Sequence, residues 1–432
     1  MKCRSKIGGD LKEIFTLGDM YVSDFIAENE SPRAGEEEMK LMLCEKTGLL
    51  QLESAVDPDF MYGKYWYRSG VNTSMTRELE DVVASVIDAV PTESGDIFLD
   101  IACNDGTLLK NVQPYTGESG FFRIGVDPCD DTFLNEAKQH ADWIIQDYFT
   151  KDCYNNSPHN EKWDGKWSGK KAKLITCIAM FYDLDNPRQF LSDVYDVMDD
   201  EGLFVLQMSY TPLMLQQLAF DNICHEHVCY YSLSSIKTIL EAEGFNVVDC
   251  ILNDVNGGSF RIYVRKNVAT TNLFRTAPYR DVANFRIDSI LSHEKNLKLD
   301  EPEIYEKFYK DICDLRDQTV EFVKKAKAEG ATIWGYGAST KGNTLLQWFG
   351  LDHTLIDGIA ERNPQKYGMK TVGTNIPIFS EAEMREASPD YLLILPWHFI
   401  KEFKDRENLY LEQGGKFIFR IKLNYIPPKK CC

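Results

Sequence analysis

The sequence lacks any long apolar run and has fewer basic than acidic residues. No apolar segment approaches the roughly 20 residues that cross a bilayer. The N-terminus, MKCRSKIGGDLKEIF, has no apolar core followed by small cleavage-site residues, so we expect no secretory signal. Its 48 lysines and arginines face 67 aspartates and glutamates, a formal net charge of -19 that disfavours nucleic acid as a partner. We expect a soluble, cytoplasmic monomer or homodimer that binds a small or nucleotide-linked molecule.

The 12 cysteines show no disulfide-like spacing, and in a reducing compartment such cysteines are ordinary buried thiols. A chain of 432 residues is too long for one ordinary core. Four regions are expected: an irregular N-terminal module (1–60) with a charged helical stretch starting near Glu36, a first α/β domain (61–270), a helical connector (271–330) whose amphipathic pattern ends at Gly330, and a second, smaller α/β domain (331–432).

Short aliphatic runs alternate with helical patterns in both larger regions, which predicts βαβ units and mainly parallel sheets. In the first α/β domain the last two runs, 247–254 and 260–266, have no helical pattern between them and could form an antiparallel hairpin. The other expected strands are 96–102, 122–128, 141–147, 173–181 and 202–210 in the first domain, and 332–339, 355–361, 376–379, 391–397 and 416–421 in the second.

The segment IFLDIACNDGTLL (97–109) combines a strand, a tight turn and a helix start. The strand ends in Asp100, and the turn after it can present backbone N–H groups and let a ligand approach closely at Gly106. Asp127 ends the next strand about 20 residues on, the spacing at which a carboxylate accepts both hydroxyls of a ribose.

Asp147 follows the third expected strand, where it could meet an adenine amino group, with Tyr148 and Phe149 as stacking partners. The three pieces in this order predict an S-adenosylmethionine (SAM) site in a class I methyltransferase fold, a Rossmann-like α/β domain. The alternatives are a plain Rossmann-like domain with solvated acidic loops, or an NAD site, which would prefer the G-x-G-x-x-G absent here. The candidate cofactor residues are Asp100, Ala102, Asn104, Asp105, Gly106, Asp127, Asp147 and Tyr148.

Four further segments accompany the SAM region: YWYRSG (65–70), HEH (225–227), NGGSFR (256–261) and GYGASTKGN (335–343). On the SAM region together with these segments, the sequence resembles the sugar C-methyltransferases that make branched deoxysugars such as mycarose and noviose. The resemblance covers nearly the whole chain. It implies an N-terminal zinc module, a SAM domain and a C-terminal α/β domain that enclose a nucleoside-diphosphate ketosugar.

The N-terminal module departs from that family. The family usually carries two C-x-x-C pairs there, and four thiolates make a closed structural zinc site. Here the first pair is Cys3 and Lys6 and the second is Cys44 and Thr47, so each has lost one ligand. We expect a metal-free module held by its apolar residues; replacement ligands from the C-terminal cysteines, Cys431 and Cys432, are the alternative.

The HEH segment is the candidate catalytic centre. Methylation of a carbon beside a carbonyl needs a base to remove the α-proton, and histidine suits that transfer. The resemblance places the pair Glu226 and His227 at the sugar, which makes His227 the expected base. The family often has a tyrosine two positions before the glutamate, where this sequence has Cys224, and His225 could partly compensate. A metal site and structurally satisfied histidines are the alternatives.

Two further segments are candidates for the acceptor side. Asp183 follows the fourth expected strand, where related enzymes often have a histidine; it could bond a sugar hydroxyl, act as a second base or cap the next helix. In the family, tyrosine and serine of the YWYRSG region reach the sugar and the methyl donor, which points to Tyr65, Tyr67 and Ser69, with aromatic packing as the alternative.

The C-terminal domain supplies the expected nucleotide-sugar contacts. The glycine turn of GYGASTKGN can cradle a diphosphate with backbone N–H groups, and Lys341 adds a charge. Lys366 and His398 also follow strands of this domain and could reach the same cleft. In NGGSFR, Arg261 could meet a phosphate, or the glycines could serve only a hairpin. The candidate substrate residues are Tyr65, Ser69, Asn256, Arg261, Gly337, Lys341, Asn343, Glu361 and Asn363.

The sequence therefore predicts a SAM-dependent methyltransferase that transfers a methyl group to carbon of a nucleoside-diphosphate keto-deoxysugar through a base-generated enolate. Two other functions stay open: an O- or N-methyltransferase acting on a nucleotide sugar or other polar metabolite, and a non-catalytic protein that binds SAM or a nucleotide sugar.

Overall fold

The structure of the protein is a computed structural model that describes residues 2–62, 66–87, 89–113, 120–158, 169–271 and 277–419. The chain forms two compact units. The first comprises Met1–Ile14, Lys40–Gln217 and Glu226–Ile304, and the second comprises Phe15–Met39, Leu218–His225 and Tyr305–Cys432. The N-terminal 60 residues therefore contribute to both units, and the HEH segment passes from one to the other between His225 and Glu226.

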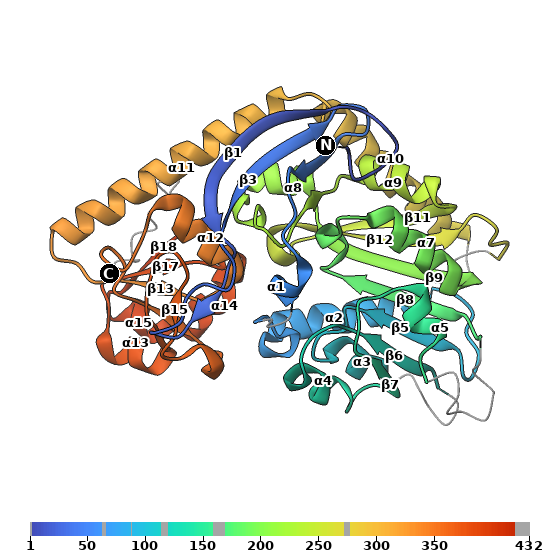
Figure 1. Cartoon of the computed structure of the whole chain (residues 1–432), viewed down its shortest axis with the longest axis horizontal. Helices are drawn as coiled ribbons and strands as arrows, with labels where there is room; N and C mark the ends of the chain where they lie inside the picture. The colour runs from blue at the N-terminus through green and yellow to red at the C-terminus, as the bar shows by residue number, and fades with distance from the viewer. Residues whose placement is uncertain are drawn as a thin grey trace. The chain divides into compact units, whose positions relative to one another are not determined.

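The first unit is built on a seven-stranded sheet in the order β11-β12-β9-β8-β5-β6-β7 (Figure 1). The five strands β9, β8, β5, β6 and β7 pair in parallel. At the other edge, β11 and β12 form the predicted antiparallel hairpin, and β12 pairs antiparallel with β9. The strands are β5 (Ile97–Ile101), β6 (Phe122–Val126), β7 (Trp143–Ile145), β8 (Ala172–Ile178), β9 (Met198–Ser209), β11 (Phe245–Asn253) and β12 (Ser259–Lys266).

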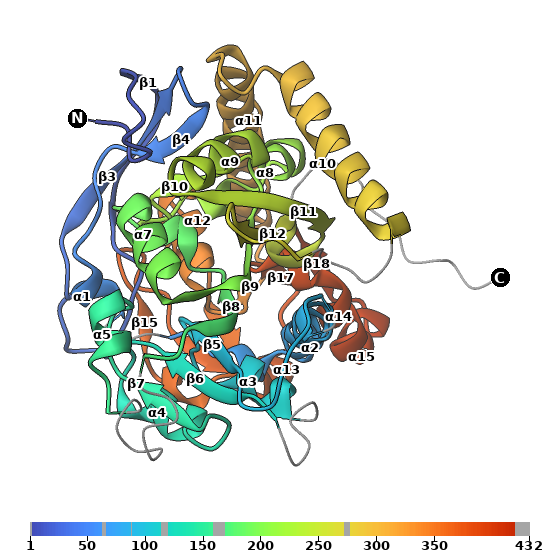
Figure 2. The ribbon, with the colours of Figure 1, turned by 90° about the vertical axis from the view of Figure 1, so that its right-hand side faces the viewer.

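Helices cover this sheet, and two of them, α9 and α10, both pack on β11 (Figure 2). The helices of the unit are α1 (Pro58–Tyr62), α2 (Thr73–Ile87), α3 (Thr107–Val112), α4 (Asp131–Ala137), α5 (Lys151–Asn155), α7 (Pro187–Val197), α8 (Thr211–Gln217), α9 (Leu233–Ala242) and α10 (Ala277–Leu297), with short 3₁₀ turns η1 (Ser69–Val71), η3 (Phe181–Asp183) and η5 (Val255–Gly257).

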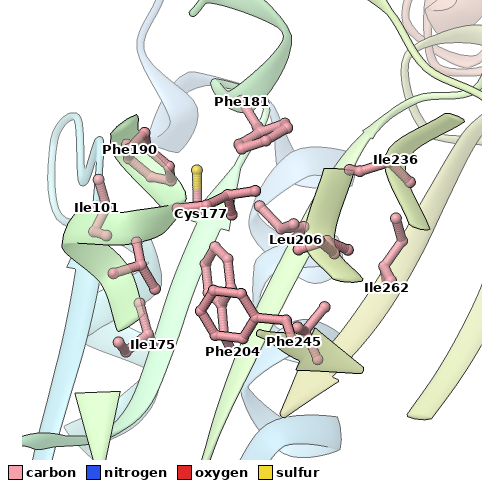
Figure 3. Packing of buried hydrophobic residues seen from close by; sticks show 14 of the residues in the cluster. Ile101, Ile175, Cys177, Phe181, Phe190, Phe204, Leu206, Ile236, Phe245 and Ile262 are labelled. Atoms are coloured by element: carbon pink, nitrogen blue, oxygen red, sulfur yellow. The ribbon is translucent and has the colours of Figure 1, made fainter. Parts of the chain in front are cut away.

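Apolar side chains form a separate cluster on each face of the sheet. In β5, Leu99 belongs to one cluster and its neighbour Phe98 to the other, because successive side chains of a strand point to opposite faces. Figure 3 shows part of the first cluster, in which the rings of Phe204 and Phe245 have centroids 6.3 Å apart. A parallel sheet buried on both faces is the expected result of βαβ connections.

A second, four-stranded sheet has the order β1-β3-β4-β10, with β1 (Leu11–Tyr21), β3 (Glu36–Cys44), β4 (Leu49–Leu52) and β10 (Cys229–Tyr230). The helical stretch predicted near Glu36 was wrong, because these residues form β3. Met39, Leu41 and Leu43 are all fully buried, which is the two-residue repeat of a strand, and Leu41 pairs with Leu52 of β4.

The second unit has the predicted second parallel sheet, in the order β16-β14-β13-β17-β18. Its strands are β13 (Ile333–Tyr336), β14 (Gly358–Glu361), β16 (Ile378–Ser380), β17 (Tyr391–Ile394) and β18 (Lys416–Ile418). Its helices are α11 (Glu303–Ala328), α12 (Thr340–Phe349), α13 (Glu381–Ala387), α14 (Ile400–Arg406) and α15 (Asn408–Glu412), with 3₁₀ turns η4 (Phe220–Asn222), η6 (Pro364–Lys366) and η7 (Trp397–Phe399). The N-terminal β2 (Phe25–Ile26) pairs with β15 (Lys370–Thr371) in the same unit.

The region predicted as one connecting helix contains two, α10 and α11. The break contains Lys298, whose φ of 56° is left-handed, and Pro302, which disfavours helical backbone at the residue before it. The second helix ends close to the predicted Gly330, which has a φ of 88°. Within the described part of the chain, no helix is long and apolar enough to cross a membrane.

Candidate active site

The turn between β5 and α3 has left-handed backbone at Ala102 (φ 62°), Asn104 (φ 51°) and Gly106 (φ 78°). A Cβ atom on Gly106 would lie only 2.7 Å from the Cα atom of Ala137 in α4. The structure thus gives this glycine a packing reason in addition to its backbone conformation, whereas the sequence suggested close approach by a ligand.

Two buried carboxylates lie at the carboxyl ends of the adjacent strands β5 and β6. Asp127 accepts the backbone N–H of Asn104 at 2.8 Å and that of Cys129 at 2.9 Å. Asp100 accepts the hydroxyl of Thr176 at 2.6 Å. Burial, with a further contribution from the charge of Asp127, raises the pKa of Asp100 to about 7. This edge of the sheet is therefore an anionic site whose charge changes near neutral pH.

The side chains of Asn104 and Asp105 are occupied by protein partners. The amide of Asn104 donates to the carbonyl of Tyr67 at 3.0 Å and accepts the backbone N–H of Ser69 at 3.1 Å. Asp105 accepts the N–H of Gly70 at 2.8 Å, and its other oxygen accepts the N–H and hydroxyl of Thr107. A ligand at this turn would consequently meet mainly backbone groups and the carboxylates at the strand ends.

The residues after β7 have different surroundings. Asp147 is exposed and accepts the N–H of Tyr148, whose hydroxyl donates to Asp59 at 2.9 Å. Phe149, a proposed stacking partner, instead packs edge-on against Phe190 with ring centroids 5.4 Å apart. Of the three predicted adenine contacts, Asp147 and Tyr148 are thus exposed, whereas Phe149 is half-buried.

His227 lies in the first unit with only 6% of its surface exposed. Its ring centroid is 4.1 Å from that of Tyr182 in η3, the short turn after β8 that also contains Asp183. Glu226, the preceding residue, is half-buried. The structure therefore places His227 against the loop that follows β8.

His225 differs from His227 in its surroundings. It belongs to the second unit, where its Nε2 lies 3.2 Å from the carbonyl oxygen of Glu37. Burial lowers the pKa of His225, so this imidazole is neutral at pH 7. Cys224 is completely buried beside it and takes the place of the family's tyrosine without presenting a phenol. These contacts favour a structural role for His225.

Asp183 does not cap the following helix α7, because Asn186 does so by accepting the N–H of Gln189. The cap alternative was therefore wrong. Tyr67 is 36% exposed, and desolvation of its hydroxyl together with the charge of Asp105 raises its pKa. Its phenol is thus a hydrogen-bond donor at neutral pH rather than a base. Tyr65 lies outside the described residues.

Arg261 on β12 is 4% exposed and is surrounded by acceptors. Its Nε donates to Gln207, one terminal nitrogen to Ser85 and the other to Glu78 at 2.8 Å. Every guanidinium nitrogen thus has a protein acceptor, which favours a structural role over phosphate binding. Asn256, at the hairpin turn before β12, has a left-handed φ of 52°.

In the second unit, the turn from β13 to α12 resembles the turn after β5. Gly337 has a φ of 85°, and a Cβ atom there would lie 2.7 Å from the Cγ of Pro396. The ammonium of Lys341 donates to the side-chain oxygen of Asn222 at 2.6 Å. Asn343 is 1% exposed and donates to the carbonyl of Asp24, so it holds the N-terminal segment of this unit.

Glu361 at the end of β14 accepts the N–H of Ala338 in the neighbouring turn at 2.8 Å, and the N–H groups of Arg362 and Asn363 at 2.8 Å each. Asn363 then caps η6. Lys366, 6% exposed, donates to the carbonyl of Ala338 at 2.6 Å and lies 4.0 Å from Glu361. Burial lowers the pKa of Lys366, while the charge of Glu361 opposes that shift.

The sequence did not reveal one contact of this unit. The indole N–H of Trp397 donates to both carboxylate oxygens of Asp221, at 3.0 and 3.1 Å. The two residues are 176 positions apart and neither belongs to a motif, so no sequence signal could have paired them. The contact and the Lys341–Asn222 bond together hold Leu218–His225 in the second unit. His398 follows Trp397 and packs on Phe399, with ring centroids 4.2 Å apart.

In the N-terminal module, the Cys3 thiol lies 3.0 Å from the hydroxyl of Ser5 and 3.8 Å from that of Thr47. Lys6 donates to Asn186 at 2.7 Å, and Arg4 donates to Asp185 at 2.8 Å. Among the described residues, no three His, Cys, Asp or Glu side chains are grouped to hold a metal ion. The described part of the module is thus tied to the α7 start by polar contacts; the C-terminal cysteines lie outside the described residues.

Comparisons with known proteins divide the chain near residue 250, within the first structural unit. The methyltransferase domain family matches residues 72–249, and the C-methyltransferase C-terminal domain family matches residues 254–422. The chain is 27% identical over 422 residues to the C-methyltransferase NovU of Streptomyces niveus, across 97% of this chain and 95% of that protein. The similarity therefore runs through nearly the whole sequence.

Two solved structures show weaker similarity. A SAM-dependent methyltransferase from Clostridium acetobutylicum is 15% identical, with 44% of this chain and 92% of that chain covered and a TM-score of 0.32. The magnesium protoporphyrin IX methyltransferase of Synechocystis, with bound S-adenosylhomocysteine, is 16% identical, with 48% and 90% covered and a TM-score of 0.32.

Proposed function

We propose that the chain is a SAM-dependent C-methyltransferase that methylates a carbon of a nucleoside-diphosphate keto-deoxysugar, a proposal supported by the two family matches and by the similarity to NovU. The predicted class I methyltransferase fold, enzyme class and methyl donor are confirmed by the family match and the sheet order. The acceptor, the roles of individual site residues, the oligomeric state and a cytoplasmic location are proposals.

The residues around the β5 turn fit SAM, which supplies an electrophilic methyl group when bound. Each oxygen of Asp127 accepts one backbone N–H, and a carboxylate oxygen can accept a second hydrogen bond, so both remain available to ribose hydroxyls. Asp100 adds negative charge that suits a ligand with a sulfonium and an ammonium group. We propose that Asp147 and Tyr148 receive the adenine at the exposed loop after β7.

The observation that carries the acceptor proposal is the presence of Lys341 beside the strand ends of the second unit. In open parallel sheets, ligands bind outside the carboxyl ends of the strands. The Lys341 ammonium there suits an anionic ligand such as a diphosphate. Gly337 turns the backbone toward the helix start, where N–H groups add to the attraction.

His227 is the proposed base. It would take the proton from the carbon beside the sugar's carbonyl, leaving an enolate whose carbon attacks the methyl group. The packing of Tyr182 against the imidazole restricts its orientation, and Glu226 would support the charge that His227 gains. Since methyl transfer needs little else from the protein, alignment of the reacting atoms would supply much of the rate.

The test is the His227→Gln variant, which keeps polarity and approximate size but cannot accept the proton. We expect turnover to fall by about 100-fold or more, a usual contribution of general base catalysis, with SAM affinity unchanged. His353→Gln is the matched control, because His353 is an exposed histidine of the second unit. Retained turnover in His227→Gln with normal SAM binding would overturn the base assignment.

A second measurement separates carbon from oxygen or nitrogen methylation. With a nucleotide ketosugar in D₂O and without SAM, the wild-type protein should exchange the hydrogen on the α-carbon, and His227→Gln should not. Absence of exchange in the wild type would favour an O- or N-methyltransferase instead.

A further inference from the structure

Four consecutive residues, Tyr67–Gly70, form a strap on the turn that follows β5. Three of them bond to the turn: the carbonyl of Tyr67 and the N–H of Ser69 to the side-chain amide of Asn104, and the N–H of Gly70 to Asp105. The fit is close, because a Cβ atom on Gly70 would lie 3.0 Å from the hydroxyl of Thr107. The strap is therefore fixed to the first of the two loops that carry the SAM carboxylates.

The fourth strap residue, Arg68, is bound to α4, the helix that follows the second loop. Its guanidinium donates to the carbonyl and hydroxyl of Thr132 at 3.2 and 3.1 Å and to Glu136 at 3.1 Å. Its Cζ lies 4.0 Å from the centroid of the Phe133 ring. All three partners belong to α4, the helix that begins directly after Asp127 and its loop.

The two loops already share one direct contact, the bond from the N–H of Asn104 to Asp127. The turn residues Ala102 and Asn104 have left-handed backbone, which side chains other than glycine disfavour, so the turn needs partners to hold its conformation. The strap provides such partners, and Arg68 is its attachment to the other side of the SAM site.

We propose that Arg68 is a positioning residue for SAM, which holds the strap across the β5 and β6 loops and so keeps the Asp127 carboxylate and the turn backbone in their binding arrangement. When the binding-competent arrangement is only partly populated, the apparent affinity falls by that fraction. Arg68 would thus act on SAM binding without touching the reacting atoms. The inference depends on SAM binding and not on the proposed sugar acceptor.

The ion pair with Glu136 contributes little to this attachment, because Glu136 is half exposed and exposed pairs are weak. The stacking on Phe133 and the bonds to Thr132 need a planar group with several donors, which lysine lacks. The expected order of SAM affinity is therefore wild type and Glu136→Gln nearly equal, then Arg68→Lys, then Arg68→Met.

A matched control exists in the same sheet. Arg123, at the opposite, amino end of β6, makes two 3.0 Å bonds to Asp142, and its side chain is 14% exposed against 15% for Arg68. Arg123→Met therefore removes an equal charge and a similar ion pair from the same unit, away from the SAM loops.

The experiment uses the full chain and titrates SAM calorimetrically without an acceptor, with melting temperature as a second readout. We expect Arg68→Met to weaken SAM binding about tenfold, or about 1.4 kcal/mol, and to reduce the rise in melting temperature that saturating SAM produces. Arg123→Met should bind SAM as the wild type does. With a working acceptor, the KM for SAM should rise while kcat at saturating SAM changes less than about twofold.

Two outcomes would overturn the inference: SAM affinity unchanged in Arg68→Met, or the same loss in Arg123→Met, which would indicate a general effect on stability. If Arg68→Met does not fold, the comparison of Arg68→Lys with Glu136→Gln decides. Equal SAM affinity in these two variants would contradict a role for the stacking and carbonyl contacts. The acceptor-free titration stays valid even if the sugar proposal fails.

Discussion

The turns after β5 and β13 use the same backbone device in two different units. Each follows a buried parallel strand, contains a glycine with positive φ and leads into a helix. In each, a carboxylate at the end of the next strand accepts an N–H of the turn at 2.8 Å, Asp127 from Asn104 in one and Glu361 from Ala338 in the other. The backbone arrangement alone therefore does not select a ligand.

The groups beside each carboxylate make the difference. Asp127 has a second buried carboxylate, Asp100, whose pKa it helps to raise, whereas Glu361 has Lys366 4.0 Å away and the turn beside it leads to Lys341. The first site suits a ligand with cationic groups and a ribose, and the second suits an anionic ligand. The charged groups next to each turn, and not the net charge of -19 of the whole chain, therefore distinguish the ligands proposed for the two turns.

Asp127→Asn tests the first site and should have the largest effect. It removes the charge that would accept two ribose hydroxyls, while its one remaining oxygen can still accept one of the two backbone N–H groups that Asp127 binds. Since hydrogen bonds to a charged group contribute about 1.5–3 kcal/mol each, we expect SAM affinity to fall about 100-fold in calorimetric titration. Asp142→Asn, which removes a carboxylate paired with Arg123, should bind SAM normally. Comparable losses in both variants would contradict the specific role of Asp127.

Lys341→Met tests the second site. Loss of one ammonium near a diphosphate should raise the KM for the nucleotide sugar about tenfold, within the usual range for a charged hydrogen bond, with SAM affinity unchanged. Lys327→Met is the control, because Lys327 pairs with Asp357 elsewhere in the same unit. An unchanged KM in Lys341→Met would remove the main support for an anionic acceptor.

The smallest effect concerns pH. Because the pKa of Asp100 is raised to about 7, this carboxyl is mostly neutral at pH 6 and mostly charged at pH 8. We expect SAM, a cation at its sulfonium, to bind about threefold more weakly at pH 6 than at pH 8, and Asp100→Asn to abolish that dependence.

The contribution of Asp100 to folding stability should change with pH in the opposite direction to SAM affinity. A carboxyl whose pKa is raised by folding binds its proton more tightly in the folded state, so its contribution to stability decreases from its ordinary pKa up to about pH 7. Urea unfolding without SAM gives the free energy of unfolding of Asp100→Asn and of the wild type. The variant should be more stable relative to the wild type at pH 8 than it is at pH 5. No difference between these two pH values would contradict the raised pKa.

Much of the fold could be predicted because its signals are local. The alternation of aliphatic strands and amphipathic helices indicated both parallel sheets, and the missing helical pattern between 247–254 and 260–266 indicated the hairpin that β11 and β12 form. The prediction failed at Glu36, where a run of charged residues looked helical, because β3 lies between β1 and β4 in a sheet and its conformation depends on these neighbours.

Prediction of the candidate site from the sequence is limited by the same dependence on distant residues. Motif spacing indicated Asp100, Asp127 and the HEH segment, yet it could not tell which polar groups are already occupied. Asn104 and Asp105 bond to the strap and to Thr107, and Arg261 bonds to Glu78, contacts that join residues up to 183 positions apart. Such contacts depend on packing and leave no periodic signal.

By itself, the sequence of this protein determined the two glycine turns, the carboxylates at the strand ends and the resemblance to C-methyltransferases, because each depends on residue types at short spacing. Only the tertiary structure decided which side chains remain available to a ligand. It placed the Gly106 turn against Ala137 and bound Arg68 to α4, since burial and hydrogen-bond partners arise only when distant segments pack together.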